Sequence, residues 1–378
     1  MTTLKHLFRH VILFVVKSLT CGIILFPILF QINAFAQNNE GLKLKPNETE
    51  TWINKGVALG NLGKTEEALQ AFDQALKLNP KDDKVWVVKG IALGKLEKNE
   101  EALQAYNQAL KLNPDNAIAW SGKGNILGKI GKSDEALQAF DQALKLNPKD
   151  AKTWHNKGIT LANVRKYSEA LPAYDQALKL KPNEEETWYS KGYALGYVGK
   201  YSEALQAYDQ ALELNPNNAK TWYRKGIALG YLKKTKEALQ AFEKALKLNP
   251  EYAEAWLNKG IALESLGKST EALRAFDQAL NFNPKIAFAW YSKASALMKL
   301  GKSTDALQAY NQALELNPKY AEAWYNKACI YSLNKDKVNA LMNLKKVIEL
   351  DPKWKEEAKK DKDFKSLWED EDFKKLVS

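Results

Sequence analysis

The chain has 378 residues, more than a single hydrophobic core usually organises, so several domains or a repeat array are expected. Its 45% apolar and 27% charged residues are ordinary for a folded protein and exclude both a disordered polymer and a protein that spans a membrane many times. The net charge is +11, and two cysteines and three histidines leave little material for a disulfide framework, a metal site or acid–base catalysis.

The first 36 residues have the order of a secretory signal. Three cations and no acidic residue accompany an apolar run over residues 18–30, and an A-x-A cleavage motif follows at Ala34 and Ala36. We therefore expect residues 1–36 to be a signal peptide, and the mature protein to be secreted or periplasmic. The alternative is that residues 11–30 remain as a membrane anchor, because they are long enough to cross a bilayer.

A tryptophan recurs every thirty-four residues from Trp52 to Trp324, nine times in all. Other columns share this period, and we number them from the tryptophan of each repeat. Alanine stands at +16 and proline at +28 in all nine repeats, and Phe or Tyr stands at +20 in eight, with Leu344 in the ninth. Self-similarity at this period predicts a helical solenoid.

Each repeat predicts two amphipathic helices. In the first repeat Trp52, Gly56 and Leu59 form one apolar stripe, and Ala68 and Phe72 begin the stripe of a second helix. Glycine at +11 in five repeats can take the positive φ that ends the first helix, and Ser, Thr or Asn at +13 in six repeats can cap the second. The proline at +28 then stops the second helix.

These columns of Trp, Gly, aromatic-x-x-Ala and Pro resemble the tetratricopeptide repeat (TPR) family over nine tandem repeats, residues 49–352. The resemblance implies an all-α fold, a right-handed superhelical solenoid of antiparallel helix pairs. Residues 37–48 are expected to hold a linker and the remnant of a degenerate repeat. Residues 353–378 carry apolar side chains at helical spacing, which predicts a helical cap on the last repeat.

Recognised motifs for chemistry are missing from the sequence. Triplets such as Gly131-Lys132-Ser133 lack the first glycine of a phosphate-binding loop and fall in turns between helices. Once residues 1–36 are removed, only His155 and Cys329 remain of their kinds, and no zinc-protease, C-x-x-C or G-x-S-x-G motif occurs. We therefore expect no enzymatic activity, no catalytic residue, no metal and no cofactor.

Function is expected on the face of each first helix opposite its tryptophan stripe, at positions −2, +1, +2, +5 and +9. The resemblance implies that this face lines the concave groove of the superhelix and receives an extended or helical segment of a partner. The fifth and sixth repeats carry tyrosines and cations there, the types enriched at binding hot spots. The candidate partner-binding residues are Tyr189, Tyr193, Tyr197, Lys220, Tyr223, Arg224 and Tyr231. Alternatively, these tyrosines pack against the adjacent first helix and only line the groove.

Lysine at +3 in every repeat would suit a basic ladder for nucleic acid, but its aliphatic stem can instead cover apolar surface beside the tryptophan. Acidic residues are interleaved throughout, and no RNA-reading motif accompanies the lysines. We expect a non-enzymatic scaffold that binds a peptide or helical segment of a protein, with no nucleic acid and with membrane contact only through an uncleaved N-terminal segment. A membrane-tethered envelope assembly factor and an RNA-binding repeat protein are the alternatives, and the oligomeric state stays open.

Overall fold

The structure is a computed structural model that describes residues 48–378. The expectations for residues 1–36, and for residues 37–48 apart from Glu48, lie outside the described residues. The described chain consists of helices and turns and contains no strand, and none of its helices combines the length and apolar character needed to cross a membrane. It divides into two compact parts at Leu96, and each is described by itself.

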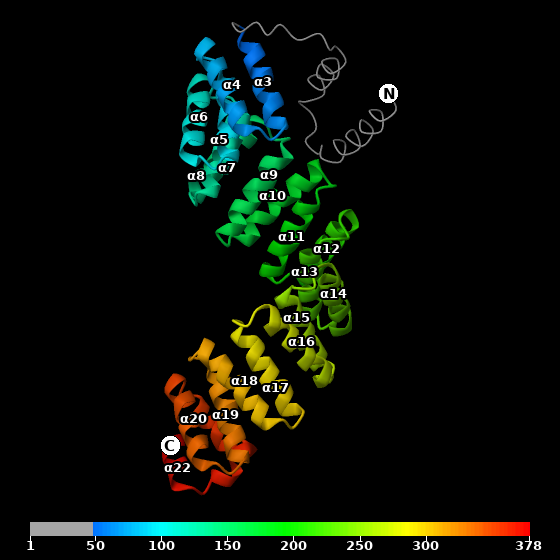
Figure 1. Ribbon diagram of the computed structural model, residues 1–378, viewed down its shortest axis with the longest axis vertical. Helices are drawn as coiled ribbons and strands as arrows, with labels where there is room; N and C mark the ends of the chain where they lie inside the picture. Colours follow the sequence, from blue (N-terminus) through cyan, green and yellow to red (C-terminus); the bar gives the residue numbers. More distant parts are fainter. Residues whose placement is uncertain (1–47) are drawn as a thin grey trace, which may run out of the picture. The chain divides into compact units, whose positions relative to one another are not determined.

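The first part contains helices α3 (Thr49–Asn61), α4 (Thr65–Leu78) and α5 (Asp83–Lys95), drawn in blue tones in Figure 1. Helix α4 packs against both of the others. Its Phe72 is buried in a core that also contains Val85 of α5, with Trp52 of α3 packed at the edge. The hydrophobic stripe of the second helix in a repeat is therefore covered on two sides.

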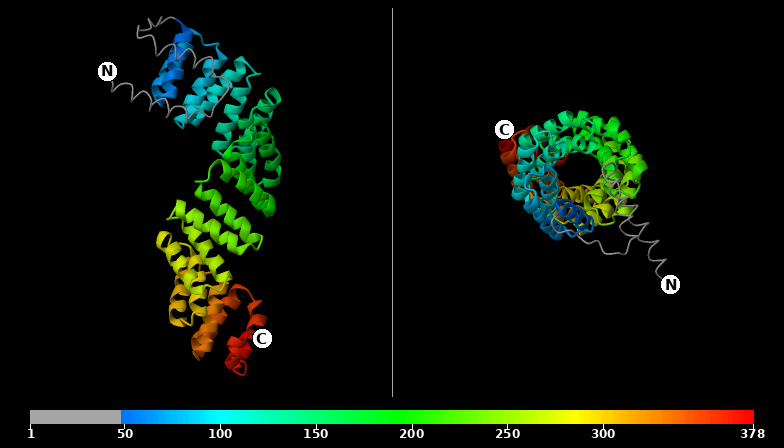
Figure 2. Two further views of the ribbon diagram at one scale, coloured as in Figure 1. Left: turned by 90° about the vertical axis from the view of Figure 1, so that its right-hand side faces the viewer. Right: turned by 90° about the horizontal axis from the view of Figure 1, so that it is seen from above.

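The second part continues the same arrangement from the second helix of repeat two to the C-terminus. Its repeat helices are α6 (Asn99–Leu112), α7 (Ala117–Lys129), α8 (Ser133–Leu146), α9 (Ala151–Asn163), α10 (Tyr167–Leu180), α11 (Glu185–Val198), α12 (Tyr201–Leu214), α13 (Ala219–Tyr231), α14 (Thr235–Leu248), α15 (Ala253–Ser265), α16 (Ser269–Phe282), α17 (Ala287–Lys299), α18 (Ser303–Leu316), α19 (Ala321–Leu333) and α20 (Lys337–Leu350). Helix α6 packs against α7, and from α7 to α20 each helix packs against the helices before and after it in the chain (Figure 2, left). The predicted all-α solenoid of helix pairs is confirmed, whereas the right-handed superhelix stays a prediction.

Close packing within a helix pair depends on the glycine at +4. A Cβ atom at Gly192 would lie 2.7 Å from Cε1 of Tyr208, so a methyl group there would force the ring to shift. Tyr208 is only 3% exposed, and Ala204 beside it is fully buried. Small residues on both helices thus let the backbones approach until one aromatic ring fills the space between them.

The turns between paired helices follow the sequence in part. The five glycines at +11 have φ between 72° and 85°, as predicted, whereas Glu97, Arg165, Lys233 and Lys335 take φ between 59° and 62° at the same position. The predicted capping at +13 is wrong. That residue is already the first of the second helix, and the lysine before it occupies the N-cap without a side-chain capping bond. The chain enters the helix one residue earlier than the pattern suggests.

The C-terminal segment covers the last repeat with helices α21 (Trp354–Lys360) and α22 (Glu371–Val377), joined by a 3₁₀ helix, η1 (Lys362–Leu367). Phe364 and Phe373 are buried in one core with Leu344 and Val347 of α20. Those two α20 residues replace the aromatic residue and the alanine of the other repeats, and both are fully buried. The ninth repeat is therefore packed against the segment that follows it.

Candidate functional site

Side chains at +1 lie between the first helices of successive repeats. The imidazole Nδ1 of His155 lies 2.9 Å from the hydroxyl oxygen of Thr187 on the next first helix. Tyr223 packs its ring 4.8 Å from that of Tyr252 and 6.0 Å from that of Phe242, and it is only 9% exposed. A helical wheel places Tyr223 on the free face, but the neighbouring helix covers it, so it offers little surface to a partner.

Arg224, one residue further on, reaches back to the fifth repeat. Its guanidinium carbon lies 4.6 Å from the ring centroid of Tyr193 and 5.8 Å from that of Tyr223, and Tyr189 is close enough to help raise the pKa of its side chain. The titratable groups that act most strongly on it are neutral tyrosines, and within the described residues it forms no ion pair with a carboxylate. The ring faces hold the cation in place without cancelling its charge.

Three tyrosines continue this cluster toward the end of α11. The rings of Tyr167 and Tyr197 stack at 4.5 Å and 15°, and Tyr193 lies 4.8 Å from Tyr197 and 6.3 Å from Tyr167. The Tyr193 hydroxyl donates a hydrogen bond of 3.3 Å to the hydroxyl of Tyr197, and this bond together with burial raises the pKa of Tyr193 to about 12. Tyr193 therefore stays neutral at physiological pH, while Tyr197 is 56% exposed.

A second stack repeats the same geometry one repeat later. Tyr201 and Tyr231 lie 4.3 Å apart with their rings 3° from parallel, and Tyr231 is 64% exposed. In both stacks a tyrosine at +13 meets a tyrosine at +9 of the next repeat. Tyr167 and Tyr201 were not predicted from the sequence, because their stacking partners lie on a helix of the next repeat. Comparing column +13 with column +9 of the following repeat reveals both pairs.

We call this set the tyrosine surface; its members are Tyr167, Tyr189, Tyr193, Tyr197, Tyr201, Arg224 and Tyr231. Of the predicted site residues, the structure joins Tyr189, Tyr193, Tyr197 and Arg224 into one cluster, and places Tyr231 in the second stack. Lys220 is exposed in the first turn of α13, where its backbone N–H donates to Asn218.

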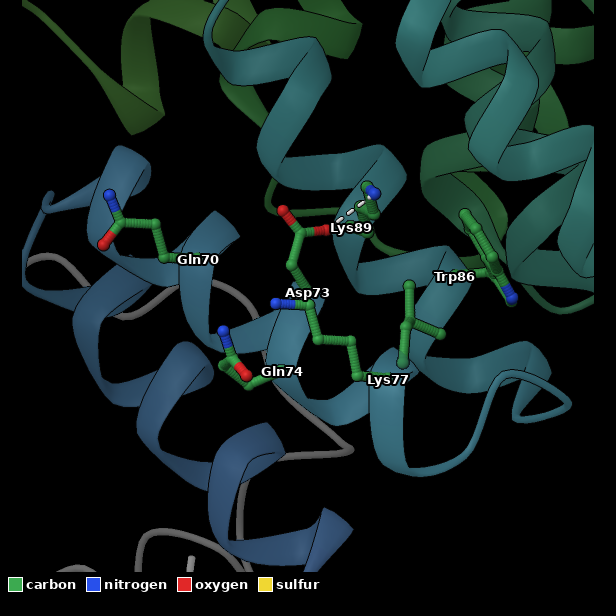
Figure 3. Close-up of a pocket in the computed structure, with 7 residues that line it drawn as sticks. Gln70, Asp73, Gln74, Lys77, Trp86 and Lys89 are labelled. Carbon is green, nitrogen blue, oxygen red and sulfur yellow. Dashed lines mark ion pairs between the residues drawn. The ribbon is translucent and has the colours of Figure 1, made fainter.

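The lysines at +3 form contacts within the array of repeats. Each lysine Nζ lies 4.8–5.5 Å from the ring centroid of the tryptophan one turn before it. In six repeats the same lysine pairs, at 2.6–3.2 Å, with an acidic residue on the preceding second helix. Figure 3 shows one such pair, Lys89 with Asp73, beside a hollow of about 430 Å³ that Gln70 and Trp86 also line. These lysines stabilise the contact between repeats.

One group of possible metal ligands lies under the C-terminal cap. The ligand atoms of Cys329, Asp361 and Asp363 all lie within 4.8 Å of one another. The carboxylate of Asp361 already accepts bonds from the Tyr325 hydroxyl at 2.8 Å and from the Asp363 backbone N–H at 3.0 Å. Burial raises the pKa of the Cys329 thiol, so the thiolate that a metal requires is disfavoured. These contacts join α19 to the C-terminal cap.

Comparison with known proteins supplies a family and several related folds. Models of the tetratricopeptide repeat family match residues 87–151 and 223–285, residues 49–82, 151–184, 185–218 and 287–320, and residues 309–342. No curated protein sequence matches the chain.

Among solved structures, the chain is similar to YrrB, a TPR protein with an unusual peptide-binding site, at 28% identity and a TM-score of 0.45, over 50% of this chain and 98% of YrrB. It is also similar to MamA from Desulfovibrio magneticus RS-1, at 24% identity and a TM-score of 0.43, over 45% of this chain and 96% of MamA. PilF from Pseudomonas aeruginosa aligns at 18% identity and a TM-score of 0.49, over 58% of this chain and 98% of PilF.

Proposed function

The chain belongs to the tetratricopeptide repeat family, and from this premise we propose that it is a protein-interaction scaffold that holds a peptide or helical segment of a partner on the tyrosine surface. The observation that carries the proposal is Arg224, a cation held on tyrosine rings without a carboxylate partner among the described residues. A partner can supply the missing anion or acceptor.

The packing of the tyrosine surface supports binding at low entropic cost. Tyr197 is fixed by the stacked ring of Tyr167 and by the hydroxyl of Tyr193, although more than half of its surface is open to solvent. Ordering a side chain on association costs about 0.5–1.5 kcal/mol, and a ring that is already held avoids most of that cost. Large, preorganised aromatic rings are typical of binding hot spots.

We further propose that the protein acts without turnover, as members of this family generally do. Two side chains with reactive groups, those of His155 and Cys329, form contacts that hold structural elements together. His155 is hydrogen-bonded between repeats with a pKa lowered by burial, and Cys329 is a buried thiol beside Asp361. Neither lies in the tyrosine surface.

A secreted or periplasmic location belongs to the same proposal, and it rests on the signal-like order of residues 1–36. Mass spectrometry of the mature amino terminus tests it. A chain that starts at Gln37 supports release. An intact Met1 supports the alternative, an envelope assembly factor that residues 11–30 tether to the membrane.

Site-directed photo-crosslinking in the native host tests partner binding. A photoreactive phenylalanine analogue at Tyr197 should capture one discrete protein, whereas the same analogue at Gln240, exposed on α14, should not. Introducing Arg224→Ala into the Tyr197 variant should reduce the adduct by about tenfold, the loss typical of a hot-spot truncation. Equal adducts at both positions, or no effect of Arg224→Ala, would argue against the tyrosine surface as the binding site.

A further inference from the structure

The turns between paired helices change charge along the chain. Over positions +11 to +15, repeats one to three carry three lysines against seven acidic residues, whereas repeats four to six carry six cations against three acidic residues. The six cations are Arg165, Lys166, Lys200, Lys233, Lys234 and Lys236. The two tyrosine stacks occur in the same repeats, because Tyr167 and Tyr201 stand in the turns of repeats four and five.

Four of these six cations form no ion pair within the described residues. Lys200 pairs with Glu203 at 3.1 Å, and Lys166 lies 4.0 Å from Glu169. The other four are exposed, and within residues 48–378 none of them forms an ion pair: Arg165, Lys233, Lys234 and Lys236. In repeats one to three, by contrast, the lysine at +12 always pairs with a glutamate three residues later.

Two of the unpaired cations occupy a backbone position that favours glycine. Arg165 and Lys233 have φ of 62° and 59°, whereas five other repeats place glycine at +11. A side chain in this left-handed region costs free energy relative to glycine. Neither an ion pair within the described residues nor the backbone geometry of the turn therefore accounts for the cations at these two positions.

The tyrosines beside these cations offer apolar surface of a defined kind. Tyr197 and Tyr231 are each covered on one side by a stacked partner, and they remain 56% and 64% exposed. Aromatic platforms of this type receive prolyl rings and other flat apolar groups of extended peptides. Neighbouring cations favour carboxylates at the adjoining positions of the same peptide.

Building on the proposed function, we propose that the bound segment is an extended acidic peptide that contains proline. Its carboxylates lie on Arg165, Lys233 and Lys234, and its prolyl rings lie on Tyr197 and Tyr231. A protein segment fits better than a nucleic acid, because Glu169, Glu203 and Glu237 alternate with the cations and repel a continuous phosphate backbone. In a peptide, carboxylates that alternate with uncharged residues can lie on the cations without lying on those glutamates.

Fluorescence anisotropy with two labelled synthetic peptides tests this inference on the purified full-length chain. The probes are alternating Glu-Pro and alternating Gln-Pro peptides of about twelve residues, which their prolines keep extended. We expect the Glu-Pro probe to bind at least about tenfold more tightly, and to weaken when salt is raised from about 50 to about 200 mM. Equal affinity for the two probes would overturn the inference.

A pair of charge-matched triple variants locates the binding. Arg165→Glu with Lys233→Glu and Lys234→Glu should weaken the Glu-Pro probe about tenfold or more. The control, Lys98→Glu with Lys132→Glu and Lys302→Glu, changes the net charge equally in other turns and should alter affinity less than about twofold. Equal losses in both variants would show a general charge effect and refute the site. Circular dichroism melting verifies that both variants fold.

Two further arms separate the possible failures. A labelled uridine oligonucleotide of similar length that binds more tightly than the Glu-Pro probe would overturn the acidic-peptide inference in favour of nucleic acid. If the Glu-Pro probe does not bind while Arg224→Ala still reduces the photo-crosslinked adduct about tenfold, the scaffold function stands and only the acidic class of partner is refuted. If the Glu-Pro probe does not bind and Arg224→Ala does not change the adduct, both proposals are refuted.

Discussion

The indole N–H of Trp222 donates a hydrogen bond of 2.9 Å to the backbone carbonyl of Pro216. Pro216 ends the fifth repeat, and Trp222 lies in the first helix of the sixth repeat. The same bond, at 2.8–3.0 Å, recurs for every tryptophan of this column from Trp86 to Trp324. Two columns of the sequence repeat are thus the two ends of one hydrogen bond, which fixes each turn against the following helix.

Replacing the indole at one junction should measure this bond. Trp222→Phe keeps a ring but removes the donor, so it should lower the free energy of unfolding by about 1 kcal/mol, the usual net value of a hydrogen bond, plus a small packing loss. Trp222→Ala should cost about 3 kcal/mol. Trp368→Phe is the control, because its buried Nε1 has no hydrogen-bond partner in the described chain. Urea unfolding should show the larger loss for Trp222→Phe, and equal losses would contradict the role of the bond.

Tyr223 and Tyr231 should separate stability from binding. Tyr223 is buried against Tyr252 and Phe242, so Tyr223→Ala should lower the free energy of unfolding by about 3 kcal/mol. Tyr231 is mostly exposed, so Tyr231→Ala should cost under about 1 kcal/mol and instead weaken partner binding. Thermal melting measures the first effect and the anisotropy assay the second. A larger loss of stability in Tyr231→Ala than in Tyr223→Ala would contradict the burial of the two side chains.

His155 should make the protein less stable in mild acid. Burial is the main cause of its lowered pKa and outweighs Glu186 and Glu184, which favour the charged form. The unfolded chain therefore binds the proton at higher pH than the folded chain, and stability falls as pH drops below about 6.5 toward the folded pKa. Melting temperatures between about pH 8 and about pH 5 should show this loss. In His155→Gln the loss should shrink, and an unchanged profile would assign it to other groups.

The C-terminal cap should be needed for the stability of the ninth repeat. Phe373 is 2% exposed and packs with Phe364 over Leu344 and Val347, so Phe373→Ala should cost about 3–5 kcal/mol. Exposing those α20 residues should also promote self-association, which light scattering can detect. Lys337→Met removes only partly exposed ion pairs with Asp370 and Asp372, and it should leave the free energy of unfolding almost unchanged.

The lysine column should tolerate loss of charge but not its reversal. Lys225 pairs with Asp209 at 2.6 Å and lies over Trp222, and both charged groups are partly exposed. Lys225→Met keeps the stem over the ring and should cost under about 1 kcal/mol. Lys225→Glu places like charges together and should cost roughly 1–2 kcal/mol more. Urea unfolding at low and high salt should show that the difference shrinks as salt rises.

Prediction from sequence succeeded for the apolar columns that pack within one helix pair. The aromatic residue at +20 and the glycine at +4 face each other because they lie on paired helices of fixed spacing. The capping residue at +13 failed because a pattern does not define a helix start to within one residue. Tyr167 and Tyr201 were missed because their partners lie in the next repeat.

The sequence by itself determined the helix pairs, their order and the columns that form the core, since a strict thirty-four-residue period leaves a single way to bury the same stripe nine times. Only the tertiary structure decided which tyrosines are exposed and which are buried, and which cations form no ion pair within residues 48–378. Those properties depend on how the next repeat packs across each helix. Tyr223 and Tyr231 are two tyrosines of the same helix, and the next repeat covers the first but leaves the second exposed.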